Sequence, residues 1–216
     1  MGEILNSGAG MAWAATVIRK EPWEVNPRLL ELLTSREKLL LVRDVAVSSA
    51  ADATPFHCAN APGTFAYQNG TYALRDALIG THDWCLDRPD NVEAVRSETA
   101  NILIAFANVD LACVDEHQPK PRSQKGSGSE RTSQTSLFAS LPQFAPIPND
   151  RRALFYVMVD ENGAVEFSRP IIKNKTFVNS IERNYLSDGG DEKPFSRMFD
   201  SGDPDHFDPQ VIRKRA

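Results

Sequence analysis

Each of the three cysteines in this chain has a histidine close by in the sequence. The pairs are His57-Cys58, His82-Cys85 and Cys113-His117. Imidazole and thiolate are preferred ligands of zinc, so the pairs make a metal-dependent enzyme one hypothesis for the function. The chain has no C-x-x-C motif, however, and every cysteine lies in or beside apolar sequence. Free thiols therefore explain the cysteines more simply, and we expect no metal and no cofactor.

Three acidic residues offer a second route to a metal-dependent enzyme. Asp110, Asp160 and Glu166 lie at the ends of expected strands, where carboxylates can hold catalytic metal ions. The presence of Asp160 is already explained by the hairpin turn expected from Asp160 to Gly163. The sequence contains no nucleophile elbow, P-loop, zinc-protease or dinucleotide-binding motif. We therefore expect binding rather than catalysis and assign no catalytic residue.

Residues 116–136 are rich in Pro, Gly, Ser and Thr and contain almost nothing apolar. Such a stretch buries too little surface to offset the entropy of ordering it, so we predict a flexible loop without helix or strand. Four cations and one acid (Glu130) give positions 120–131 a net charge of +3. The predicted binding residues are Lys120, Arg122, Lys125 and Arg131.

A protein partner is the expected ligand of this cationic loop. The segment from Ser187 to Pro209 has the opposite character, with seven acids against two cations, and it offers a second contact surface. Nucleic acid is an alternative partner, because a basic segment can follow a phosphate backbone. The loop has no aromatic residue on which bases could stack, which weakens that alternative. A loop that contacts only solvent is the simplest interpretation.

Composition sets the broad class of the protein. The chain has 216 residues, of which 41% are hydrophobic, and a net charge of −5. These values are typical of a globular protein and argue against a general polyanion binder. No apolar run approaches a membrane span, and the N-terminus lacks the charged head of a signal peptide. With its odd cysteine count, the chain is expected in a reducing cytoplasm, without membrane contact.

Helices are expected mainly in the first third of the chain. Asn26-Pro27 has the residue types of a helix start, and Thr34 with Glu37 fits a capping box for a helix over 38–50. Residues 51–64 are expected to form a loop. Asn69-Gly70 predicts a turn, after which a short helix runs from Thr71 to Gly80.

Strands are expected on both sides of the 116–136 loop. The expected ranges are 84–88, 92–97, 102–107, 109–114, 154–159 and a half-exposed strand at 165–168 that Pro170 ends. Leu154, Tyr156, Met158 and Val159 are expected in a buried central strand beside Ile102, Ile104 or Phe106. The spacing of Phe177, Val178, Ile181 and Tyr185 predicts a C-terminal helix.

This order of elements predicts an α+β fold: a mainly antiparallel sheet with N-terminal helices and one C-terminal helix packed on it. We expect a single domain over residues 1–186, interrupted by the 116–136 loop. A loosely ordered acidic tail is expected over 187–216.

Five stretches of the chain carry a likeness to known sequences. They are GTFAYQNGTYALRDALIG (63–80), NVDLAC (108–113), PRSQKGSGSER (121–131), VEFSRPI (165–171) and SIERNYL (180–186). Together they resemble an uncharacterised family of bacterial proteins found on mobile elements, and the likeness covers residues 63–186. The resemblance implies a bacterial, cytoplasmic protein in a plasmid or genome-conflict context. It transfers no activity, fold or functional residue.

Overall fold

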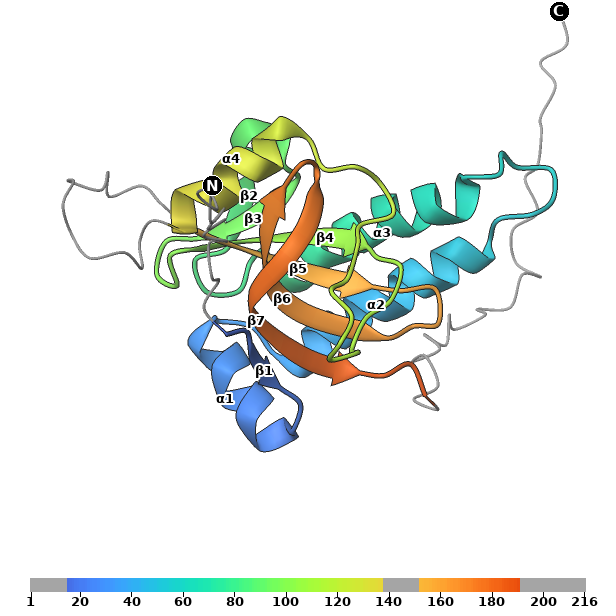
Figure 1. Ribbon diagram of the computed structural model, residues 1–216. Helices are drawn as coiled ribbons and strands as arrows, with labels where there is room; N and C mark the ends of the chain where they lie inside the picture. The colour runs from blue at the N-terminus through green and yellow to red at the C-terminus, as the bar shows by residue number, and fades with distance from the viewer. Residues whose placement is uncertain (1–14, 138–151, 191–216) are drawn as a thin grey trace, which may run out of the picture.

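One mixed β-sheet organises the part of the chain that the computed structural model describes, residues 15–137 and 152–190 (Figure 1). The α-helices in these ranges are α1 (Pro22–Glu31), α2 (Arg36–Ala51), α3 (Ala61–Leu78) and α4 (Ser127–Leu137). A short 3-10 helix, η1, spans Pro89–Asn91. The strands are β1 (Val17–Arg19), β2 (Cys85–Asp87), β3 (Ala94–Ser97), β4 (Ile102–Asn108), β5 (Ala153–Val159), β6 (Val165–Lys173) and β7 (Thr176–Ser187).

The seven strands lie in the order β1-β7-β6-β5-β4-β3-β2. Neighbouring strands are antiparallel except in two pairs, β1 with β7 and β4 with β5. The predicted α+β class with a mainly antiparallel sheet is therefore confirmed. The strands predicted over 92–97 and 102–107 are present as β3 and β4, which form an antiparallel pair.

The predicted central strand is confirmed as β5, which has three strands on each side. Its residues Leu154, Tyr156, Met158 and Val159 are each at most 4% exposed. Ile104 of β4 lies opposite Phe155, and Phe106 lies opposite Val157. The sequence of β5 is apolar on both sides because both faces of the sheet are covered.

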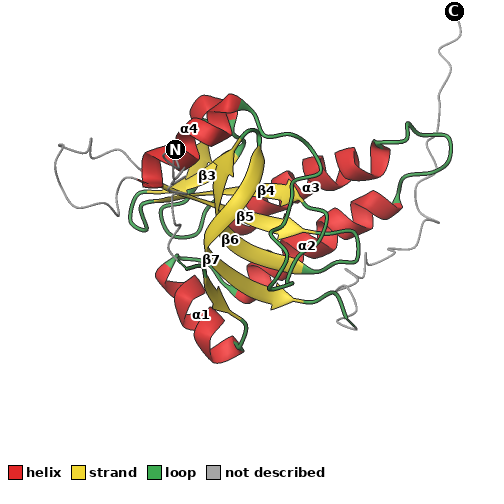
Figure 2. Ribbon diagram, viewed as in Figure 1, coloured by secondary structure: helices red, strands yellow, loops and turns green. Residues whose placement is uncertain are grey.

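The two faces of the sheet carry separate cores. On one face, Ile104, Phe106 and Val157 pack with the inner sides of α2 and α3. On the other face, Ala105 and Tyr156 cluster with Phe177 of β7. Here α4 contacts β5 and β6, so the helices cover opposite sides of the strands (Figure 2).

The predicted 51–64 loop is present over residues 52–60, but residues 61–64 and the predicted Asn69-Gly70 turn belong to one continuous helix, α3. Gly70 lies inside α3 because the helix crosses β4 at this point. A Cβ atom at position 70 would lie 2.6 Å from Cζ of Phe106. The glycine therefore serves a close helix–strand contact, which local sequence rules interpret as a turn.

Two glycines of α3 give a matched prediction. Gly70→Ala should lower the free energy of unfolding by about 1–3 kcal/mol, because the new methyl group must displace the Phe106 ring. Gly63→Ala should leave it unchanged or raise it by up to about 1 kcal/mol, because its Cβ would meet only Asn108 Nδ2, at 4.0 Å. Urea unfolding of both variants checks this. Equal effects at the two positions would contradict the described contact.

The C-terminal helix predicted from Phe177 to Tyr185 is wrong, because these residues form β7. The spacing of four between Phe177, Ile181 and Tyr185 is even, so it fits one face of a strand as well as a helix. Two predictions for β6 are also wrong. The strand continues through Pro170 to Lys173, and Glu166 is fully buried instead of half exposed.

The N-terminal helix starts are shifted from their predicted positions. Helix α1 begins at Pro22 and contains Pro27 in its interior. Helix α2 covers the predicted range, but Ser35 caps it in place of Thr34, accepting a hydrogen bond from the Lys38 N–H at 3.4 Å. The strand predicted over 109–114 is reduced to a single bridge between Val109 and Pro121.

Candidate functional site

The predicted 116–136 loop is divided into a loop and a helix. The expectation that it contains no helix is wrong, because residues 127–137 form α4. Contacts with residues that are distant in the sequence fix the position of this Ser-rich helix. Gly128 packs against the backbone of Asp90 so closely that no side chain would fit there. The Ser133 hydroxyl donates to the Pro170 carbonyl at 3.1 Å.

The four predicted binding cations have different surroundings. Lys120 is exposed. Arg122 donates to the Glu161 carboxylate at 2.6 Å, and Arg131 donates to Asp90 at 2.7 Å. Lys125 points into the protein. Two of the four charges are therefore balanced by carboxylates, and Lys120 and Lys125 remain as the residues of interest.

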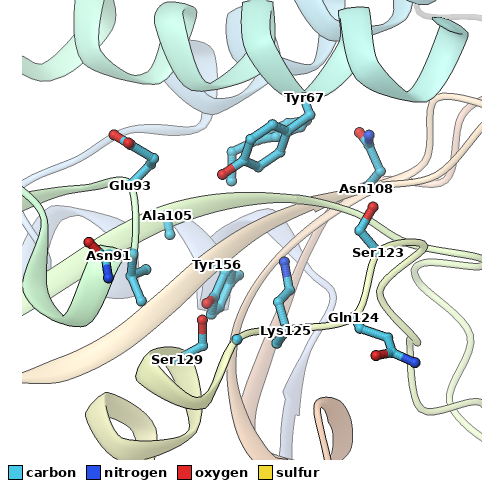
Figure 3. Close-up of a pocket in the computed structure, with 13 residues that line it drawn as sticks. Tyr67, Asn91, Glu93, Ala105, Asn108, Ser123, Gln124, Lys125, Ser129 and Tyr156 are labelled. Carbon is cyan, nitrogen blue, oxygen red and sulfur yellow. The ribbon is translucent and has the colours of Figure 1, made fainter. Parts of the chain in front are cut away.

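Lys125 belongs to the segment before α4, and its half-buried side chain lies against the sheet (Figure 3). Its ammonium nitrogen lies 4.9 Å from the ring centroid of Tyr156 and 5.4 Å from that of Phe177. Burial lowers the pKa of Lys125 to about 8. The described residues contribute no carboxylate within ion-pair distance of this ammonium group.

A pocket of about 210 Å³ opens beside Lys125. It lies where β3 separates from β4, because the last paired residues are Ala94 and Ala105. The wall is assembled from α3, β4, β5, the residues before β3 and the start of α4. Its polar side chains are Tyr67, Asn91, Glu93, Asn108, Ser123, Gln124, Lys125, Ser129 and Tyr156.

The hydroxyl group of Tyr156 is a buried polar group without a well-formed hydrogen bond. The residue is 2% exposed, and the hydroxyl of Ser129 lies near enough to lower its pKa slightly but not in hydrogen-bonding geometry. Burial raises the pKa of this phenol to about 12, so it stays a neutral donor at physiological pH. Ser129 lies next to it in the pocket wall, at the start of α4 (Figure 3). An unsatisfied buried hydroxyl costs about 1–3 kcal/mol, which a ligand could recover.

Helix α4 begins at this pocket. Gly126 and Ser129 belong to the wall, and the Glu130 N–H donates back to the Gly126 carbonyl at 3.4 Å. The N–H groups of Ser127, Gly128 and Ser129 precede that bond, so they have no acceptor within the helix. They form the positive end of the helix dipole.

Two further titratable groups face the pocket. Burial raises the pKa of Glu93, but its ion pairs with Arg75 and Arg88 outweigh this effect and leave the pKa below its usual value. Glu93 is therefore a neutralised carboxylate. The pKa of Tyr67 is raised, mainly by burial, so this phenol is also neutral. Lys125 supplies the uncompensated charge of the pocket.

The Cys/His pairs do not assemble into one site. Cys58 is exposed, Cys85 contacts Arg96, and the Cys113 thiol donates to the Val165 carbonyl at 3.2 Å. Burial raises the pKa of the Cys113 thiol to about 12, which makes it unreactive. Across residues 15–137 and 152–190, no group of three or more His, Cys, Asp or Glu side chains is arranged to hold a metal ion.

The strand-end acids have structural partners. Asp160 accepts hydrogen bonds from the backbone N–H groups of Asn162 and Ala164 in its turn. Asp110 contacts His117 at 3.1 Å. Glu166 is buried in an ion pair with Arg183 at 2.6 Å. The metal-dependent alternative therefore gains no arranged ligand set from these three acids.

Sequence reasoning missed Tyr156 and Ser129 as members of a site. Tyr156 lies in a strand whose other residues are apolar, and its hydroxyl group is the one sequence signal for a role in a polar site. The segment Lys125-Gly126-Ser127-Gly128-Ser129 is recognisable as Gly-rich with a lysine, but it has the composition of a linker.

Comparison of the chain with protein-family models, curated proteins and solved structures found no match. In the described part of the chain, every helix is too short or too polar to cross a bilayer.

Proposed function

We propose that this protein binds a small molecule that carries an anionic group, and that Lys125 provides the counter-charge in the pocket. The observation that carries the proposal is the half-buried ammonium group of Lys125, which has no carboxylate partner in the described residues. A buried charge without a partner is costly to the fold. An anion entering the pocket would remove that cost.

The aromatic rings around Lys125 support the same proposal. The rings of Tyr156 and Phe177 stabilise the ammonium group weakly, by about 0.5–2 kcal/mol, and leave it available to a stronger partner. The neighbouring Glu93 is held by two arginines and does not compete with a ligand for Lys125. The pocket therefore combines one available cation with neutral hydrogen-bonding groups.

The test is a pair of lysine variants, titrated by calorimetry with acetate and with inorganic phosphate. Lys125→Met keeps a flexible apolar stem against the rings and removes the charge. This variant should weaken binding of whichever anion the native protein binds more tightly. The expected loss is about 10–100-fold, the range expected for a charged hydrogen bond. Lys120→Met removes an exposed charge nearby and should change the affinity less than twofold. Equal losses in both variants, or no binding of either anion to the native protein, would contradict the proposal.

We further propose that the segment around Lys120 contacts a protein partner, as the loop composition favours. The exposure of Lys120 supports this second proposal. Arg122 and Arg131 contribute less to it, because Glu161 and Asp90 already neutralise them. Co-purification from the native host with Lys120→Ser tests it, with Lys173→Ser as the control. An unchanged set of partners would contradict it.

A further inference from the structure

We infer that the anionic group is a phosphate, held at the N-terminus of α4 between Ser129, Tyr156 and Lys125. The inference rests on the proposed anion pocket and specifies which anion it takes. A helix N-terminus is a common site for phosphate groups, because its free N–H groups and the helix dipole both favour negative charge. The independent observation here is the buried Tyr156 hydroxyl, which lines the same pocket beside Ser129 and forms no well-formed hydrogen bond.

The donors of this site come from three directions. The start of α4 lines the pocket through Gly126 and Ser129 and contributes the Ser129 hydroxyl. An anion held there also meets the free N–H groups of the first helical turn, residues 127–129. The sheet contributes the Tyr156 hydroxyl, and the preceding loop contributes the Lys125 ammonium group. A phosphate monoester presents three acceptor oxygens on a tetrahedral centre with a charge of about −1.5 to −2. A planar carboxylate has two oxygens and one charge, so it satisfies fewer of these donors.

The start of α4 is fixed in place before any ligand binds. The backbone of Gly128 contacts that of Asp90, and Arg131, one turn further along α4, holds the Asp90 carboxylate at 2.7 Å. Lys125 is anchored as well, since its N–H donates to the Lys175 carbonyl at 2.9 Å. Donors held in this way lose little freedom on binding, which favours affinity.

The remaining pocket limits the rest of the ligand. Its volume of about 210 Å³ is smaller than the ~300–1,000 Å³ typical of pockets for drug-sized ligands. Beyond the phosphate there is room for a small organic group between Tyr67 and the amide side chains of Asn91 and Asn108. A phosphate monoester of a small hydroxylated compound fits this combination of size and polarity.

The experiment compares inorganic phosphate, glycerol 3-phosphate and acetate on the native protein and on three variants. Phosphate and glycerol 3-phosphate should bind at least tenfold more tightly than acetate. Tyr156→Phe and Ser129→Ala should each weaken phosphate binding about fivefold or more. The control Tyr72→Phe, on an exposed tyrosine, should leave it unchanged. In two-dimensional amide NMR spectra, phosphate should shift the signals of Ser127, Gly128 and Ser129, a readout that needs no variant.

The outcomes separate this inference from the proposed function. If acetate binds as tightly as phosphate, and Lys125→Met abolishes the binding of both, the anion pocket is supported but the phosphate inference is wrong. If phosphate binds but leaves the three amide signals unmoved, the phosphate lies elsewhere and the inference is also wrong. If neither anion binds, both proposals fail. Thermal unfolding of each variant shows whether a loss of binding reflects a loss of fold.

Discussion

Arg183→Met is expected to lower the free energy of unfolding by about 3–5 kcal/mol, because it leaves the buried Glu166 carboxylate without a counter-charge. The side chains of Arg183 and Glu166 are only 3% and 0% exposed. Their two hydrogen bonds, of 3.0 and 2.6 Å, form a bidentate pair between β7 and β6. Arg183 also donates to the carbonyls of Val114 and His117, so the variant releases the loop after β4 as well.

Two further variants make this prediction specific. Arg19→Met removes an arginine that lies 3.8 Å from Glu182 and is 26% exposed, so it should cost less than about 1 kcal/mol. The double variant Glu166→Met with Arg183→Met removes both charges, and it should be more stable than Arg183→Met alone. Urea unfolding measures all three. A cost below about 1 kcal/mol for Arg183→Met would contradict the buried pair.

Anion binding is expected to depend on pH through Lys125. The pKa of this ammonium group is lowered to about 8 in the ligand-free protein, and a bound anion must raise it. Binding is then strongest below about pH 8 and weakens about tenfold for each pH unit above it, because the neutral amine must first take up a proton. From pH 8 to 10, the dissociation constant should rise on the order of 100-fold.

The other groups in the pocket do not contribute to this pH range. The pKa of Glu93 is lowered, and those of Tyr67 and Tyr156 are raised, so all three keep their charge state between pH 7 and about 9. A phosphate monoester loses its second proton near pH 6, so glycerol 3-phosphate, which is mainly a dianion from pH 7 to 10, is the ligand for this measurement. Calorimetry from pH 7 to 10 measures the slope. A flat profile in the native protein, or an equal slope in Lys125→Met, would contradict the coupling.

The sheet was largely predictable, because its central strands carry a strong local signal. The runs in β4 and β5 are apolar at consecutive positions, as expected for strands covered on both faces. Strand β7 lacks that signal, because Glu182, Arg183 and Asn184 are polar and still buried. Their partners lie on other elements, for example Glu166 on β6, and local periodicity does not report such pairs.

Helix α4 could not be predicted, since its sequence favours a linker and its contacts are distant in the chain. Gly128 and Arg131 both meet Asp90, about forty residues earlier, and this packing outweighs the low helix propensity of the segment. Because α4 packs in this position, the side chain of Lys125 just before it points into the protein. Charge composition predicted Lys125 as a binding residue, but the inward direction of its side chain depends on the tertiary structure.

The most direct test of the central claim is the pKa of Lys125, measured by NMR on protein with ¹³C-labelled lysine. The Lys125→Met spectrum assigns the signal. The pKa should be about 8 in the ligand-free protein and should rise by at least about two units when phosphate saturates the pocket. A pKa near the ordinary lysine value of about 10.4, unchanged by phosphate and by acetate, would contradict the claim that the half-buried Lys125 ammonium group binds an anion.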